Sequence, residues 1–170
     1  FPIALDDFGA RIDYQDLVEG SFRLEEAVVH THYLNHPALA LGYRVEADGA
    51  RIAYCCDHEP HAAVHASGEA VLTGADARHA DFVRSADLVV HDAQYTIEEY
   101  PSKLGWGHST VEYTVQVCVD ADVARLLLTH HDPTRDDAGV RALQTRARAL
   151  ARARGSNLEV IAAAEGMTLV

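Results

Sequence analysis

The chain has 170 residues, 48% of them hydrophobic and 24% charged, which is typical of a single globular domain with a buried core. Its formal net charge of −12 disfavours a nucleic-acid partner, because phosphate backbones are bound by clustered lysine and arginine. A small anionic substrate remains compatible with this charge if bound cations reverse the local field. No apolar run is long enough to cross a membrane, and the sequence shows no signal peptide.

The cysteines predict a reducing environment. Cys55, Cys56 and Cys118 are odd in number, and two of them are adjacent. This pattern is not that of a disulfide framework, so we expect reduced, buried thiols and a cytoplasmic protein.

Hydrophobic patterning predicts strands first and then alternating helices and strands. Extended segments are expected at 22–33, 39–47 and 51–56, with a hairpin turn at Asp48-Gly49. The remaining predicted elements are a helix at 75–86, a strand at 87–93, a helix at 109–121, a strand at 124–130, a helix at 137–154 and a strand pair at 158–170. Ser109 and Glu112 predict a capping box, and Gly155 predicts the end of the last helix. This order predicts an α/β fold in one domain, residues 1–170.

Titratable side chains follow three of the predicted strands. These groups are Asp57-His58-Glu59, His91-Asp92 and His130-His131-Asp132, and His36 precedes the strand at 39–47. Ligand sites of α/β sheets lie beyond the carboxyl ends of the strands, so we expect these groups to converge. Imidazole and carboxylate are good ligands for divalent metals, which activate water for hydrolysis. The sequence therefore predicts a site for metal-assisted hydrolysis.

A second motif, "GHST", lies where the helix at 109–121 is expected to begin. Free backbone N–H groups at a helix N-terminus favour negative charge, and His108 there could protonate a leaving oxygen. A polar cap with an exposed histidine explains the same residues, and the motif alone does not decide between the two interpretations.

The other histidines are assigned no catalytic role. His30 and His32 lie on one face of a predicted strand, and we expect them to be structural or to support the site. His61, His65 and His79 are predicted to be surface residues.

Three stretches carry a family resemblance: "LNHPALALGYRVEADGARIAYCCDHEP", "SADLVVHDAQYTIEEYPSKLGWGHST" and "RLLLTHHDPTRDD". From about residue 20 to the end, the chain resembles the C-terminal two-thirds of a metallo-β-lactamase-fold hydrolase. The closest likeness is to the branch of ribonuclease Z-like enzymes and phosphodiesterases. The resemblance implies that this chain forms part of a four-layer αββα sandwich.

The resemblance also implies roles for individual residues. The metal ligands would be His36, Asp57 and His130, with Asp57 bridging two divalent ions, zinc foremost and manganese or iron as alternatives. His108 would act near the leaving group as a catalytic residue together with Asp57. The residues that support the site or contact substrate would be Asp92, Ser109 and His131.

One feature of the family is missing, because the His-x-His-x-Asp-His signature does not occur in this sequence. We expect that the sequence begins partway through a longer chain; alternatively, another chain supplies the signature, or the chain is not catalytic. A homodimer is also expected as a possible assembly. The expected function is a dinuclear metal-dependent phosphodiesterase that uses a metal-bridged hydroxide on a small anionic substrate. The alternatives are a lactonase or β-lactam hydrolase of the same fold, and a non-catalytic binding or dimerisation module.

Overall fold

The structure, a computed structural model, describes residue 9 and residues 12–169. The expectation of a truncated start concerns Phe1, which lies outside the described residues, as does Val170 at the end of the predicted strand pair.

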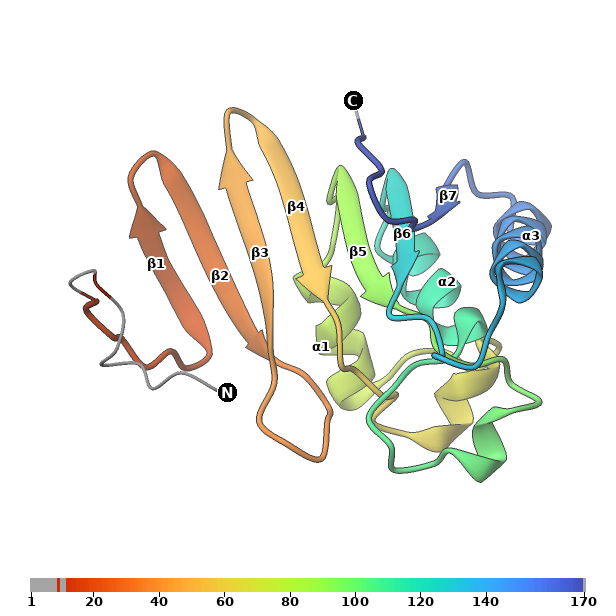
Figure 1. Ribbon diagram of the computed structural model, residues 1–170. Helices are drawn as coiled ribbons and strands as arrows, with labels where there is room; N and C mark the ends of the chain where they lie inside the picture. The colour runs from red at the N-terminus through yellow and green to blue at the C-terminus, as the bar shows by residue number, and fades with distance from the viewer. Residues whose placement is uncertain (1–8, 10–11, 170) are drawn as a thin grey trace.

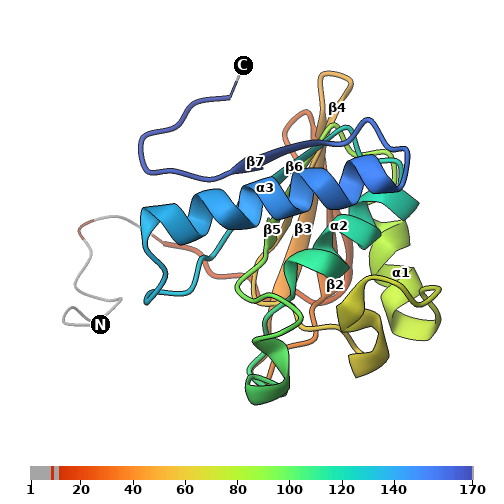
Figure 2. The ribbon, with the colours of Figure 1, turned by 90° about the vertical axis from the view of Figure 1, so that its right-hand side faces the viewer.

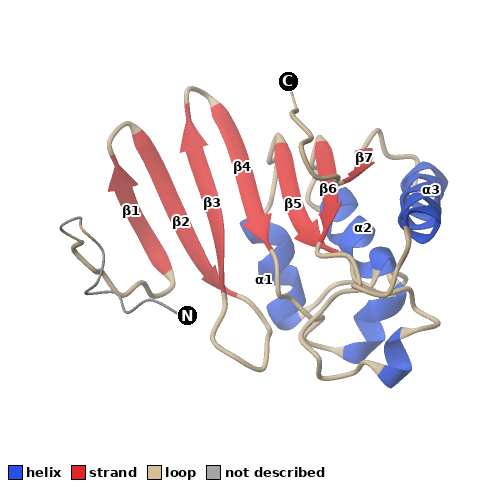
Figure 3. Ribbon diagram, in the orientation of Figure 1, coloured by secondary structure: helices blue, strands red, loops and turns tan. Residues whose placement is uncertain are grey.

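The described chain forms one seven-stranded mixed sheet in which the strands lie in sequence order (Figures 1 and 3). The strands are β1 (Gly20–Leu24), β2 (Ala27–Tyr33), β3 (Leu41–Ala47), β4 (Ala50–Cys55), β5 (Leu88–Asp92), β6 (Arg125–Thr129) and β7 (Glu159–Ala162). Pairing is antiparallel from β1 to β4 and parallel from β4 to β7.

Helices connect the parallel strands and lie on one face of the sheet (Figures 1 and 2). The α-helices are α1 (Gly74–Phe82), α2 (Val111–Asp120) and α3 (Asp137–Ala153), and the short 3₁₀ helices are η2 (Ala63–Ser67) and η3 (Tyr100–Ser102). Parallel strands require crossover connections, and these are almost always right-handed. Because β4 to β7 advance across the sheet in one direction, three such crossovers place all three α-helices on the same face.

Residues alternate along the parallel strands between the helical face and the opposite face. On β4, Ala53 and Cys55 are fully buried beneath the helices, whereas Ile52 and Tyr54 are 44% and 49% exposed. The register pairs Tyr54 with Tyr43 and Ile52 with Val45, so these apolar side chains share the opposite face. One sheet and one helical layer confirm the predicted α/β class and make up half of an αββα sandwich.

Two predicted strand segments were wrong in detail. Residues 22–33 form two strands, β1 and β2, because the chain turns at Glu25 and Glu26, with Glu25 in the left-handed region at φ 52°. The predicted closing pair contains one strand, β7, and residues 163–169 lie outside any strand. In the first case no glycine, proline or asparagine marked the turn.

The helix caps differ in one place from those predicted. Thr110, not Ser109, caps α2, and its hydroxyl accepts a hydrogen bond from the Tyr113 backbone N–H. The predicted capping box is therefore wrong: the residue three positions after Thr110 is Tyr113, and the Glu112 carboxylate bonds instead to the Ile97 N–H and to Arg146. The end of α3 is confirmed, because Gly155 follows it with a left-handed φ of 66°.

Two further expectations concern membrane-spanning segments and the state of the cysteines. No helix in the described part of the chain is long and apolar enough to cross a membrane. The three cysteines are free and buried, as expected.

Candidate metal centre

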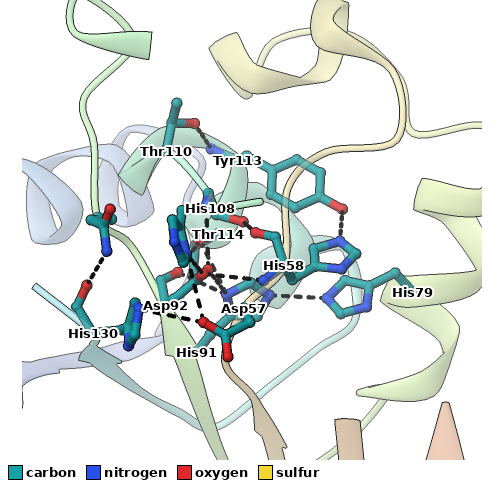
Figure 4. Close-up of polar contacts among 12 residues, drawn as sticks. Asp57, His58, His79, His91, Asp92, His108, Thr110, Tyr113, Thr114 and His130 are labelled. Carbon is teal, nitrogen blue, oxygen red and sulfur yellow. Dashed lines mark hydrogen bonds and ion pairs between the residues drawn. The ribbon is translucent and has the colours of Figure 1, made fainter. Parts of the chain in front are cut away.

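Four loops meet at the edge of the sheet where β4, β5 and β6 end. β2 is antiparallel to β3, and β3 to β4, so β2 runs parallel to β4 and ends at the same edge. His36 follows β2, Asp57 follows β4 and His130 follows β6, while His108 lies just before α2. The expectation that polar groups after separate strands would converge is therefore met, as Figure 4 shows for Asp57, His108 and His130.

The four side chains lie close enough to share bound ions. One donor atom from each of His36, Asp57 and His108 lies within 4.8 Å of the others. His130 joins this group, since its Nε2 lies 3.3 Å from Oδ1 of Asp57 (Figure 4). The ring centroids of His108 and His130 are 4.8 Å apart. Imidazole nitrogen and carboxylate oxygen are donors that zinc, manganese and iron accept, so this set fits a divalent metal.

Asp57 and His130 share an uncommon backbone conformation. Their φ angles are 66° and 53°, in the left-handed region that non-glycine residues rarely adopt. Such a conformation costs roughly 1–2 kcal/mol per residue and concentrates at functional sites. His130 directly follows β6 and Asp57 lies two residues after β4, so both conformations occur where the chain leaves the sheet at this edge.

Gly107 allows His36 to approach this edge. A Cβ atom on Gly107 would lie 2.1 Å from Cδ2 of His36, and the φ of Gly107 is 88°. Only glycine combines this left-handed conformation with so close an approach.

Glu59 holds the loop that contains Gly107. This buried carboxylate accepts hydrogen bonds from the Tyr100 hydroxyl at 2.7 Å and from the backbone N–H groups of Gly105 and Gly107, both at 2.8 Å. The sequence analysis did not predict this role for Glu59. The one available signal was its place in Asp57-His58-Glu59, directly after a predicted strand.

Asp92 lies beneath His108 and orients its ring. Oδ2 of Asp92 accepts hydrogen bonds from Nδ1 of His108 and from the backbone N–H of His58, both at 3.1 Å (Figure 4). Burial alone would raise the pKa of the Asp92 carboxyl, but hydrogen bonds from His108 and His91 outweigh it and hold the pKa below its usual value. Asp92 in turn raises the pKa of His108, so the protonated imidazole is stabilised.

Ser109 and His131 take other positions. Ser109 is fully buried, its hydroxyl donates to the backbone carbonyl of His58, and its N–H lies 3.4 Å from Oδ1 of Asp92. Ser109 thus braces the loops behind His108. His131 lines a separate cleft between α3 and the segment after β7, together with Asp137 and Ala163.

A buried histidine network lies behind Asp92, which corrects the prediction that His65 and His79 are surface residues. His58, His79 and His91 are fully buried, and His65 is 3% exposed. Nδ1 of His91 donates to the Asp92 backbone carbonyl at 2.8 Å, so its Nε2 accepts from Nε2 of His79 at 2.9 Å (Figure 4). Burial lowers the pKa of His79 well below its usual value, which favours the neutral ring.

The same network continues to α1. Nδ1 of His58 accepts from the Asn35 N–H, so its Nε2 donates to the Tyr113 hydroxyl at 3.1 Å. That hydroxyl donates to Asp76, whose other oxygen lies 2.7 Å from Nδ1 of His65. The residues that contact these histidines, such as Tyr113, are distant in sequence, which is why no local pattern revealed their burial.

Comparisons with known proteins identify relatives in sequence and in fold. The chain is 27% identical over 177 residues to ribonuclease Z of Lactococcus lactis, an alignment that covers 76% of this chain and 58% of that protein. The chain thus spans little more than half the length of this curated relative.

Solved structures show the same fold. A metallo-β-lactamase fold protein of Bacillus subtilis superposes with a TM-score of 0.65 at 16% identity, over 87% of this chain and 50% of that one. The short form of human tRNase Z superposes with a TM-score of 0.56 at 20% identity, over 88% of this chain and 45% of that one. The fold is therefore that of the metallo-β-lactamases. A family model described as the beta-lactamase superfamily domain matches residues 18–131, which is more than half of the chain, and the chain belongs to this family.

Proposed function

We propose that this chain is part of a metal-dependent hydrolase that cleaves phosphodiesters. One observation carries the proposal: Asp57 lies among three histidines from separate loops, and one of them, His108, is paired with the buried carboxylate of Asp92. This places a set of metal donors beside a group that can hold and release a proton.

We propose that the site binds two divalent ions, with His36, Asp57 and His130 as ligands from this chain. Asp57 has two carboxylate oxygens, so it can contact both ions, and His130 is already 3.3 Å from one of these oxygens. When bound, such ions supply a Lewis acid and lower the pKa of water. Zinc is our first choice because of the nitrogen and oxygen donors, and manganese or iron would accept them too.

His108 would hold the proton that the leaving group needs. Its Nδ1 is fixed by Asp92 at 3.1 Å, so its Nε2–H is the end of the ring left to face a substrate. Because Asp92 raises the pKa of His108, the protonated ring is favoured and can donate to an oxygen that departs from phosphorus.

This proton donor favours a phosphodiester over the alternatives within the fold. A departing alkoxide gains most from a positioned acid, and the ribonuclease Z relative is named for cleaving a phosphodiester chain. A lactone or β-lactam would use the same metal donors and is the second candidate. The net charge of −12 favours a small anionic substrate over a long RNA, although RNA belongs among the substrates to be tested.

We propose further that this chain is the C-terminal portion of the hydrolase domain. The His-x-His-x-Asp-His signature is absent from the sequence, and the alignment covers 58% of the Lactococcus lactis relative. The sheet face opposite the helices carries exposed Val45, Ile52 and Tyr54, as expected of a surface that a second sheet covers in an αββα sandwich. The remaining metal ligands would come with that second sheet.

Two properties accompany the proposal. Three reduced cysteines suit a cytoplasmic location. A homodimer would cover the exposed sheet face, but a second copy of this chain would not bring the missing signature.

The test is a substrate panel assayed with the full-length, metal-loaded protein. We expect turnover of an activated phosphodiester, and little turnover of a lactone or a β-lactam under the same conditions. Preference for the lactone or β-lactam would replace the phosphodiesterase assignment. If purified full-length protein held no stoichiometric metal and cleaved none of the three, the chain would belong to a non-catalytic module.

A further inference from the structure

The loop from Lys103 to Gly107 is fixed beside the candidate metal centre. Glu59 binds the backbone N–H groups of Gly105 and Gly107, and Gly107 packs directly against the ring of His36. In Figure 1 this loop is the green segment beyond η3, below the ends of β5 and β6. A loop held by a buried carboxylate presents its side chains in one arrangement.

Large apolar side chains project from this loop and from the neighbouring loop that carries His36. Trp106 is 56% exposed, Leu104 is 60% exposed, and Leu39 is 81% exposed. A cleft of about 360 Å³ lies between the two loops and is lined by His36, Glu59 and Leu104 among others. Leu104 lines this cleft, and Trp106 is an exposed residue two positions further along the same loop. Exposed apolar side chains beside a cleft mark binding sites.

Lys103 holds the indole ring and brings a positive charge to an acidic molecule. Its Nζ lies 4.1 Å from the ring centroid of Trp106 and 5.7 Å from that of Tyr95. Tyr95 connects this pair to the candidate centre, because its ring lies 6.2 Å from that of His108. A cation over an aromatic face is attracted to it, so Lys103 restricts the orientation of the indole.

We propose that Trp106 and Lys103 form a subsite for a substrate in which an aromatic group is joined to phosphate, as in a nucleotide. Trp106 would stack on the aromatic ring, and Lys103 would attract the phosphate while it holds the indole in place. Stacking of a base on an aromatic side chain is sequence-tolerant and contributes appreciably to affinity. This inference rests on the proposed phosphodiesterase function, since it names the chemical class of group that the site selects.

Binding can be measured separately from activity. Trp106 is the only tryptophan in this sequence, so the fluorescence difference between wild type and Trp106→Phe reports on this subsite. We expect adenosine 5′-monophosphate to quench this fluorescence, and ribose 5-phosphate, which lacks the base, to leave it unchanged. Excitation at the red edge of the indole band avoids absorption by the nucleotide.

Calorimetry with the same two ligands separates the two residues. Trp106→Ala should weaken binding of adenosine 5′-monophosphate roughly 5- to 150-fold and leave binding of ribose 5-phosphate unchanged. Lys103→Met should weaken both ligands, because both carry the phosphate. Val71→Ala is the control, since it removes an exposed apolar side chain that lies outside both loops and does not line the cleft.

Kinetics then distinguish a failure of the subsite from a failure of the proposed function. In Trp106→Ala we expect a higher KM for an aromatic phosphodiester and an unchanged KM for an aliphatic one. Equal binding of the two ligands in both wild type and Trp106→Ala would overturn the subsite, while metal content and turnover of the aliphatic diester would still support the proposed function. Absence of phosphodiester turnover in wild type would overturn both.

Discussion

Oδ2 of Asp92 lies 3.1 Å from Nδ1 of His108, and this contact joins the carboxyl end of β5 to the loop before α2. Asp92 is fully buried, whereas His108 is only partly so. The pair therefore consists of a fixed carboxylate and an imidazole with one ring edge directed outward. This is the arrangement from which the proton-donor role of His108 follows.

Replacing His108 should separate proton donation from metal binding. Because Asp92 occupies Nδ1 of His108, we expect His108→Ala to lower turnover roughly 10²–10⁴-fold, the usual scale of acid–base assistance, without loss of metal. Turnover and elemental analysis of the same preparation check this. His30→Ala, on β2 away from the candidate centre, is the control. Loss of metal in His108→Ala alone would instead make His108 a ligand.

Asp92→Asn should move the alkaline limit of activity to lower pH. In wild type, Asp92 raises the pKa of His108, so the acid form persists as pH rises and is lost only when pH passes that raised value. The amide removes the negative charge, so the pKa of His108 falls and turnover declines at a lower pH. The pH dependence of kcat measures this shift. An alkaline limit that does not move would show that another group carries the proton.

Gly107→Ala should displace His36 and weaken metal binding. The added Cβ would lie 2.1 Å from Cδ2 of His36, closer than any real contact allows. Gly105→Ala is a matched control: its φ is 82°, close to the 88° of Gly107, but its Cβ would meet no atom within 4 Å. Both variants bear the cost of a left-handed alanine, about 1–2 kcal/mol.

Metal titrations of these two glycine variants test whether the packing of Gly107 positions His36 for metal binding. Only Gly107→Ala should show a weaker affinity for the metal. Equal affinities in the two variants would mean that the packing of Gly107 against His36 has no part in placing the ligand.

The buried histidines should make the protein less stable in acid. Burial lowers the pKa of His79 well below its ordinary value of 6.5, whereas the unfolded chain titrates near that value. The unfolded state therefore binds more protons as pH falls below about 6.5, and the free energy of unfolding decreases by up to about 1.4 kcal/mol per pH unit for each such proton. Above this pH the neutral ring contributes its full stability.

Urea denaturation between neutral and mildly acidic pH measures this effect. His79→Gln should be less stable than wild type at neutral pH, because the bond to His91 is altered, yet its stability should depend less steeply on pH. A variant with the same pH dependence as wild type would show that His79 is not the group that takes up the proton.

The convergence of loops at the sheet edge could be predicted from the sequence, whereas the buried hydrogen bonds behind that edge could not. Buried apolar strands that end in Asp57, Asp92 and His130 produce a strong local pattern, and the edge at which they meet follows from parallel pairing. The convergence of the loops could therefore be anticipated. The family resemblance added the metal-ligand role of His36, and it favoured the proton-donor interpretation of His108 that the GHST motif alone had left open.

What the sequence could not predict depends on contacts between distant segments. His79 lies on a helix with polar neighbours, and it is buried only because His58, His91 and Tyr113 surround it. Glu59 is buried because the loop at 100–107 folds over it. The cap at Thr110 replaces Ser109 because the Ser109 hydroxyl bonds to His58 instead. Each case is decided by tertiary hydrogen bonds.

The metal content of the purified full-length protein tests the central claim most directly, when wild type is compared with Asp57→Ala. Asp81→Ala is the matched control, because Asp81 is an exposed aspartate on α1 whose ion pair with Arg84 is also at the surface. We predict stoichiometric divalent metal in wild type and Asp81→Ala, and loss of metal and turnover in Asp57→Ala. Full retention of metal by Asp57→Ala would contradict the account.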